Sequence, residues 1–422
     1  MTRPAADAAP PDAPIRPVSE PPAALYVHIP FCVSLCPYCD FVVYAGAEAR
    51  GPRNRIASFL DALLVELELR ADALDRVHAA VARPPLETVY LGGGTPSLVE
   101  AESLARLLDR IRARFGLAGG AEVTLEVNPG SDERGDARAW RDIGITRLSI
   151  GAQSLDRGEL RRLGRRHGPG DVVESVAAAR AASLGSVSLD LLYDVPSSSL
   201  ETWQATLDDA LALEPDHLSL YALTLDDPDA EGLTGPTGDH LPTTAGARRW
   251  RDRARGDQDD DRGAAQYGLA SDRLAADSWR GYEISNWARP GHESRHNLVY
   301  WERRPYEALG PGAHAFDGHT RRWSAARLNG YLAALTPPDG SRPGLPPGGV
   351  EVIDPVTARA ERIILGLRTD RGVPAALAGE APLAGSAGWA IESGLLEEVA
   401  GERLALTTRG RLLSNELFRR LV

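Results

Sequence analysis

Short apolar runs alternate with longer amphipathic stretches along the first half of the chain. Runs rich in β-branched and other apolar residues predict buried strands at residues 24–29, 87–91, 122–127, 147–152, 186–193 and 217–224. The stretches between them predict helices with one apolar face, among them residues 54–76, 99–115, 169–183 and 200–213. Regular alternation of this kind predicts an α/β fold, in which helices cover a parallel sheet.

The pattern becomes less regular from residue 226. Residues 226–265 are rich in Asp, Gly, Pro and Arg, which predicts a solvated, mobile loop. A helical run to about residue 278, a strand-like run at 281–288 and an irregular region to about residue 348 follow. A Gly/Pro-rich linker at 337–349 then precedes short helices and a small sheet, which suggest a winged-helix-like tail.

Four segments are therefore expected. Residues 1–22 form a disordered tail, because they are rich in Pro, Ala and Asp. Residues 23–225 form the main α/β domain, and residues 226–348 form an acidic loop followed by the irregular region. Residues 349–422 form a small helical, winged-helix-like domain.

Charge and composition narrow the classes of partner. The 422 residues carry a net charge of −12, so a phosphate backbone would repel the chain as a whole. The C-terminal segment is not basic either, which disfavours nucleic-acid binding by a winged helix. No apolar stretch is long enough to span a bilayer, and the start lacks the apolar run of a signal peptide. A cytoplasmic protein that binds no nucleic acid is expected.

All three cysteines of the chain lie within one octapeptide. Cys32, Cys36 and Cys39 are separated by three residues and then by two. An odd number of cysteines argues against a disulfide framework, whereas clustered thiols favour a metal site. Zinc would require a fourth ligand, for which His28 is the nearby candidate. A [4Fe-4S] cluster held by three thiolates would leave one iron open to another ligand.

The residues around the cysteines carry a family resemblance. The segments Tyr26-Val-His-Ile-Pro-Phe-Cys32 and Cys39-Asp40-Phe41 resemble the oxygen-independent coproporphyrinogen III oxidase family of radical S-adenosylmethionine (SAM) proteins. Within that family the chain is most similar to the HemW-type heme chaperones. The resemblance implies a partial (β/α)6 barrel, a [4Fe-4S] cluster on Cys32, Cys36 and Cys39, and SAM bound to its open iron.

Residues at the ends of the expected strands match cofactor-binding positions of this family. Gly92-Gly93-Gly94-Thr95-Pro96 joins a strand to a helix, and glycines there allow the backbone to approach a ligand closely. Asp190 lies among leucines, where a carboxylate needs a buried partner or a ligand. Taken alone, Glu126 is typical of a solvated strand end, and Tyr26 and Tyr38 are typical of core residues. The resemblance implies that SAM is bound by Tyr26, Tyr38, Gly93, Gly94, Thr95, Glu126, Gln153, Arg165 and Asp190.

One turn departs from the family pattern. The segment Asp190-Leu-Leu-Tyr-Asp194-Val-Pro-Ser197 has Asp194 and Ser197 at positions where relatives have glycine. Because Asp tolerates a left-handed backbone better than most residues, the turn is expected to persist.

Two features separate the chaperone branch from the oxidase branch. The oxidases carry a further cysteine two residues after the third ligand, where this chain has Phe41. The chaperones carry a His-Asn-x-x-Tyr element, which the resemblance places at His296, Asn297 and Tyr300 as candidate heme contacts. A His and a Tyr four residues apart share a helix face, and either residue is able to ligate heme iron. The alternative is that His296 is a hydrogen-bonded core histidine.

Aromatic residues near this element would suit a porphyrin plane. Trp287, Trp301 and Phe316 are the candidates for that apolar surface.

The favoured hypothesis is a heme chaperone that binds heme on a [4Fe-4S]/SAM scaffold and transfers it to an acceptor protein. The resemblance implies that the acceptors include membrane-bound respiratory heme enzymes. The alternative is an oxygen-independent coproporphyrinogen III oxidase, which decarboxylates two propionates and requires the same cluster. A radical methyltransferase, a heme-degrading enzyme and a closed zinc protein are further alternatives.

Overall fold

The computed structural model describes residues 19–51, 54–79, 82–225 and 232–422. Most of the tail expected at 1–22 therefore lies outside the described residues. Within the described part of that tail, the Glu20 N–H donates to Asp317 O at 3.1 Å, so the chain is attached to the body before the first strand begins.

Six parallel strands form the centre of the molecule, as the hydrophobic pattern predicts. Their order in the sheet follows their order in the chain, because a helical segment joins each strand to the next. The strands are β1 (Ala24–Ile29), β4 (Leu86–Gly93), β5 (Leu117–Val127), β6 (Arg147–Gln153), β7 (Ser186–Tyr193) and β8 (His217–Ala222).

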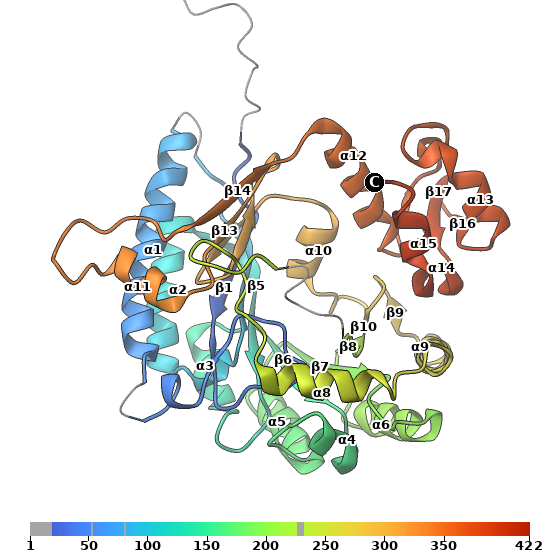
Figure 1. Ribbon diagram of the computed structural model, residues 1–422, viewed down its shortest axis with the longest axis horizontal. Helices are drawn as coiled ribbons and strands as arrows, with labels where there is room; N and C mark the ends of the chain where they lie inside the picture. The colour runs from blue at the N-terminus through green and yellow to red at the C-terminus, as the bar shows by residue number, and fades with distance from the viewer. Residues whose placement is uncertain (1–18, 52–53, 80–81, 226–231) are drawn as a thin grey trace, which may run out of the picture.

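Helices cover the outer face of these strands (Figure 1). The apolar face of α2 (Ala101–Phe115) includes Leu104, Leu108 and Ile111, which belong to the same buried core as Leu25 on β1. The main helices of this half are α1 (Ile56–Val77), α2, α3 (Ala137–Ile143), α4 (Arg157–Arg162), α5 (Pro169–Ala181) and α6 (Leu200–Ala212). Short 3₁₀ turns are η1 (Gly46–Glu48), η2 (Pro96–Leu98), η3 (Ala375–Gly379) and η4 (Leu383–Gly385).

The sheet continues beyond residue 225, where the sequence predicted the main domain to end. β11 (Tyr306–Leu309) pairs parallel with β1 and begins an antiparallel extension. In the described residues the sheet has twelve strands in all. Besides the six parallel strands and β11, it contains β12 (His314–Phe316), β13 (Thr320–Ser324), β14 (Gly348–Val352), β10 (Asn286–Ala288) and β9 (Arg280–Gly281). The strand-like run predicted at 281–288 overlaps β9 and β10. The strands β11 to β14 have three to five residues, too few for the sequence to show a strand period.

The prediction of a solvated acidic loop at residues 226–265 is wrong where the structure has helices. Residues 226–231 lie outside the described residues, but α8 (Ala245–Arg255) and the start of α9 (Asp260–Ala276) occupy half of residues 232–265. α8 buries only a narrow strip and is otherwise Arg-rich, which hid its helical period. The Asp259 carboxylate accepts hydrogen bonds from the backbone of Asp261 and Arg262, so part of the acidic run is a helix cap.

The last unit has its own core and begins after β14. Its sheet is antiparallel in the order β15-β17-β16. An isolated bridge between Glu283 and Thr369 and hydrogen bonds from Arg411 to Gly281 O and Glu283 O join it to the main sheet. Its elements are α12 (Pro355–Leu367), β15 (Val373–Pro374), α13 (Ala387–Glu392), β16 (Leu396–Val399), β17 (Arg403–Leu406), α14 (Thr408–Leu412) and α15 (Ser414–Phe418).

The described helices contain no segment that is both long and apolar enough to cross a bilayer.

Candidate functional site

The three cysteines lie on a loop that a pair of short strands closes. β2 (Phe31–Cys32) and β3 (Tyr44–Ala45) pair in parallel, with Phe31 opposite Tyr44. All three thiols are free and line one cavity of about 420 Å³. Among the described residues, no three His, Cys, Asp or Glu side chains converge as a single-ion site would require.

Polar neighbours surround two of these thiols. The Cys32 Sγ lies 3.2 Å from Thr95 Oγ1, which in turn accepts a hydrogen bond from Asn128. The Arg165 guanidinium lies 3.6 Å from Cys36 Sγ. Burial raises the pKa of the Cys32 thiol to about 12, so a coordinated metal would have to displace its proton. Three soft donors beside a guanidinium fit an iron–sulfur cluster, whose thiolate ligands bring negative charge into the site.

The cavity wall is built from alternate residues of neighbouring strands. Side chains of a strand alternate between its two faces, so Arg147, Ser149 and Gly151 of β6 face the same space. The remaining strands contribute in the same way, and the lining includes Tyr38, Gly93, Gly94, Glu126, Gln153, Arg165 and Asp190. The structure thus brings together seven of the nine expected SAM residues beside the cysteines. Thr95 joins them through its contact with Cys32.

The glycine turn after β4 needs its glycines for space. A Cβ on Gly94 would lie 2.7 Å from Phe31 O, inside the backbone of the cysteine loop. Gly93 has φ of +111°, a conformation that favours glycine, and its N–H donates to a Glu126 oxygen at 2.8 Å. The turn therefore packs against the cysteine loop and holds a carboxylate at the cavity wall.

Two carboxyl groups face the cavity away from bulk water. Glu126 accepts hydrogen bonds from Tyr90 OH and from Gly93 N, both at 2.8 Å, so it is not a solvated strand end. Asp190 accepts from Ser149 Oγ at 3.0 Å. Burial raises the pKa of Glu126 to about 7 and also raises that of Asp190. These groups are suited to hold a ligand that donates hydrogen bonds or carries positive charge.

Other lining residues were missed by the sequence analysis. Asn128 accepts a hydrogen bond from Arg165 at 2.7 Å, and Arg147 donates to Ser186 Oγ and to His292 O. The signal that could have found such residues is period two along strands already predicted. It also points to Ser149, His217, Ser219 and Tyr221.

The turn that departs from the family pattern keeps its shape. Asp194 and Ser197 have φ of 54° and 58°, as expected of residues that replace glycine in a left-handed position. The Asp194 carboxylate pairs with Arg262, so the turn is fastened to the first turns of α9, which were predicted to belong to the acidic loop.

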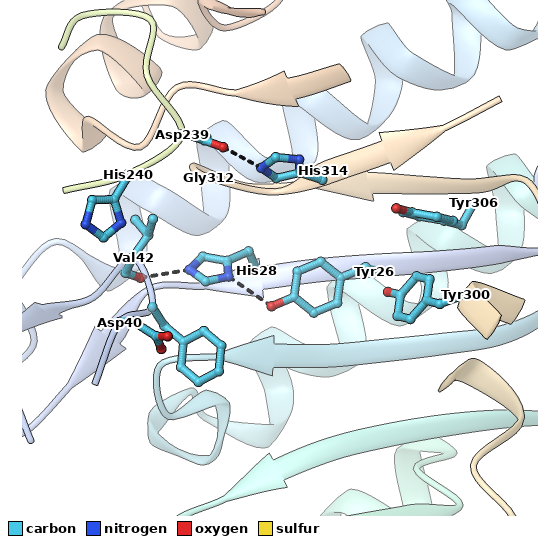
Figure 2. A pocket seen from close by; sticks show the side chains of 11 residues that line it. Tyr26, His28, Asp40, Val42, Asp239, His240, Tyr300, Tyr306, Gly312 and His314 are labelled. Atoms are coloured by element: carbon cyan, nitrogen blue, oxygen red, sulfur yellow. Dashed lines mark hydrogen bonds and ion pairs between the residues drawn. The ribbon is translucent and has the colours of Figure 1, made fainter. Parts of the chain in front are cut away.

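Tyr26 lies beside the cysteine cavity rather than in its lining, with its ring centroid 6.1 Å from that of Tyr90, which lines that cavity. Tyr26 lines a second cavity of about 320 Å³ (Figure 2). Its hydroxyl lies 2.9 Å from His28 Nδ1, and the other His28 nitrogen lies 2.8 Å from Val42 O. Asp40 and Phe41 line both cavities, which are therefore neighbours.

The His-Asn-x-x-Tyr element forms α10 (Arg295–Trp301), a short helix that Ser294 caps. His296 is only 1% exposed, with its Nδ1 2.7 Å from Thr88 Oγ1 and its Nε2 2.8 Å from Tyr300 OH. Burial lowers its pKa to about 3. Both ring nitrogens are thus occupied, which agrees with the alternative of a hydrogen-bonded core histidine.

The other two residues of this element face different spaces. Asn297 lines the cysteine cavity and Tyr300 lines the second cavity, so α10 lies between them. Trp287 and Phe316 were expected to offer a porphyrin surface, but they are 2% and 7% exposed and pack into the protein. The three heme candidates therefore do not meet at one point.

Known proteins resemble the chain over most of its length. Residues 26–210 match the Radical SAM superfamily. The heme chaperone HemW of Mycobacterium tuberculosis is 38% identical over 408 residues, which cover 97% of each chain. HemW of Escherichia coli is 36% identical over 70% of this chain and 71% of its own.

Among solved structures, the coproporphyrinogen III oxidase HemN of Escherichia coli shares the fold, with a TM-score of 0.73 and 21% identity. That likeness covers 95% of this chain and 90% of the oxidase. The match to the Radical SAM superfamily, the cysteine loop and the 38% identity over nearly the full length agree with one another. They show that the chain belongs to the HemW family of radical SAM proteins.

Proposed function

We propose that this protein binds heme and delivers it to an acceptor apoprotein, on a scaffold that carries a [4Fe-4S] cluster and SAM. The observation that carries the proposal is 38% identity to a HemW heme chaperone across 97% of both chains. The structure packs the cysteine loop, the glycine turn and α10 around two neighbouring cavities, which supports the same proposal.

We assign the cluster to Cys32, Cys36 and Cys39, whose thiols line one cavity with a guanidinium beside them. When bound, the cluster supplies an open iron that takes the amino and carboxylate groups of SAM. Glu126 and Asp190 are placed to accept hydrogen bonds from the rest of that cofactor. The residues we assign to SAM are Tyr26, Tyr38, Gly93, Gly94, Thr95, Glu126, Gln153, Arg165 and Asp190.

The acceptors we propose are membrane-bound heme enzymes of respiration, which the protein meets from the cytoplasmic side. A reducing compartment supports this placement, because three free thiols and a thiolate-bound cluster persist there. The charge of −12 argues against nucleic acid as the partner.

A transfer assay tests this function. The cluster-loaded protein is saturated with heme and mixed anaerobically with membranes from heme-deficient cells, and heme-dependent quinol oxidase activity is followed. Free heme at the same concentration is the control. Faster or more complete activation by the loaded protein supports the proposal, and activation no better than free heme contradicts it.

The oxidase reaction is the competing activity. Phe41 is 64% exposed where the oxidases have a further cysteine, so this chain has no thiol at that position. Incubation with coproporphyrinogen III, SAM and a reductant should therefore yield no protoporphyrinogen. Steady formation of protoporphyrinogen would show that the protein is an oxidase.

A further inference from the structure

The second cavity lies over the sheet extension that the sequence did not predict. β11 pairs with β1 so that Tyr26 is opposite Ala308, and it pairs with β12 so that Tyr306 is opposite Phe316. Since alternate residues of a strand share a face, Tyr26, Tyr306 and His314 all rise from the same side of the sheet. Figure 2 shows these side chains around one space, which Tyr300 of α10 also enters.

The walls of this cavity suit an aromatic, planar ligand. Tyr300 and Tyr306 meet edge to face at one end, with ring centroids 4.6 Å apart. Phe41, which follows the last cysteine by two residues, also lines this cavity. Aromatic rings of this kind favour stacking and edge contacts with a large π-system. A volume of about 320 Å³ would hold one edge of a porphyrin and leave the rest accessible to an acceptor.

His314 has the environment of an axial ligand. Its Nε2 lies 2.9 Å from Asp239 Oδ2, and its ring stacks on Trp323 with a centroid separation of 5.9 Å. Its other ring nitrogen has no hydrogen-bond partner among the described residues, and the side chain is 39% exposed. A carboxylate that fixes one imidazole nitrogen orients the ring and makes the other nitrogen a stronger metal ligand.

The other histidines already placed near the heme candidates differ from His314 in this respect. His28 contacts Tyr26 OH and Val42 O through its two nitrogens. His296 likewise uses both nitrogens and is buried. Before either residue could coordinate iron, a buried hydrogen bond would have to break, which costs free energy. Coordination by the second ring nitrogen of His314 breaks no such bond among the described residues.

Arg303 lies behind the wall of this cavity, where its Nε pairs with Glu361 at 3.0 Å. Arg303 lies over the Phe316 ring, with its guanidinium carbon 4.6 Å from the ring centroid, and Phe316 in turn contacts Tyr306. The buried Nη2 of Arg303 has no hydrogen-bond partner among the described residues. A carboxylate that reached this nitrogen would satisfy it with a charge-assisted hydrogen bond.

We propose, on the basis of the heme-chaperone function above, that heme enters this cavity with its iron coordinated by His314. Asp239 orients the ligand, and Tyr300 and Tyr306 hold the porphyrin edge. The heme then lies beside Asp40 and Phe41, which also line the cysteine cavity. The role of α10 is to present Tyr300 to heme, while its histidine serves to anchor the helix.

Anaerobic heme titration of the cluster-loaded full chain tests this assignment. His314→Ala should weaken heme binding by at least about tenfold and shift the Soret band, and added imidazole should restore the wild-type band. Asp239→Asn should keep the band but weaken binding. His319→Ala, on the same β12–β13 hairpin, is the matched control and should bind as the wild type does. Far-UV circular dichroism checks that each variant is folded.

The outcomes separate the two proposals. Failure of the wild-type protein to bind heme would overturn the chaperone function itself. Saturable wild-type binding that His314→Ala leaves unchanged would overturn only the ligand assignment. Loss of the Soret band in His296→Gln, with His314→Ala unaffected, would place the iron at α10 and would also overturn that assignment.

Discussion

At the scale of single residues, Cys36 is a proposed cluster ligand whose side chain contributes little to the packing of the fold. Its thiol lies on the loop between β2 and β3, outside the buried core, and its neighbour Arg165 is also bonded to Asn128 and Gly151. We predict that Cys36→Ala abolishes the brown absorbance of the reconstituted protein but leaves its far-UV circular dichroism unchanged. Ser34→Ala, which lines the same cavity, should retain the cluster. Full cluster absorbance in Cys36→Ala would exclude the thiol as a ligand.

His296 makes the folded state sensitive to acid. Burial lowers its pKa to about 3, from an unfolded value of about 6.5. Below about pH 6.5 the imidazole of His296 therefore binds a proton in the unfolded state but not in the folded state. The free energy of unfolding falls as the pH falls towards 3. For this residue alone the loss at about pH 5 is about 2 kcal/mol.

The matching measurement is urea unfolding at about pH 7.5 and about pH 5. The loss of unfolding free energy between the two pH values should be about 2 kcal/mol smaller in His296→Gln than in the wild type. His319→Gln, at a partly exposed turn, is the control and should behave as the wild type. An equal pH dependence in His296→Gln and wild type would show that His296 is not held neutral by burial.

At the scale of elements, α9 depends on an acidic cap in a stretch that resembles a loop. The Asp259 carboxylate accepts hydrogen bonds from Asp261 N and Arg262 N, whereas Asp260 is exposed within the first turn. Asp259→Ala should lower the free energy of unfolding by about 1 kcal/mol, because two backbone donors lose their acceptor. Asp260→Ala is the neighbouring control and should have a much smaller effect in the same urea titration. Equal losses for the two variants would contradict the capping role.

The elements differ in how well the sequence predicts them. β1 and β7 are buried on both sides, so their apolar runs are almost continuous and the sequence predicts them within a residue or two. β11 and β12 are short and owe their existence to pairing with β1 and with each other, which no local pattern shows. α8 carries Arg248, Arg249 and Arg251, so its helical face was hidden among charges.

The same contrast between local sequence patterns and long-range strand pairing explains which residues of the candidate site the sequence reveals. The cysteine loop and the strand-end residues are local motifs on predicted strands, so Cys32, Glu126 and Asp190 were found from the sequence. The second cavity lies between the predicted strand β1, which carries Tyr26, and β11 and β12, which were not predicted, so no local sequence pattern indicated this cavity. His314 and Asp239 are 75 residues apart in sequence and meet only because β12 joins the sheet.

At the scale of the whole molecule, polar contacts fasten the C-terminal unit to the edge of the main sheet, among them the ion pair between Arg280 and Asp370 and the hydrogen bonds of Arg411. Arg411 donates to Gly281 O and Glu283 O of the main sheet, while Arg409 on the same helix is exposed. Arg411→Ala should speed backbone hydrogen exchange at residues 280–288 several-fold, because those carbonyls lose their partner and the interface opens more often. Arg409→Ala should leave exchange there unchanged. Unaltered exchange in Arg411→Ala would contradict a role of Arg411 in holding this interface closed.

The central claim is that this protein carries heme on a radical SAM scaffold with two neighbouring cavities. The most direct test is an anaerobic heme titration of the cluster-loaded wild-type protein, followed by its Soret absorbance. We predict saturable binding near one heme per chain. Absorbance that rises without saturation, as free heme would give, would contradict the claim.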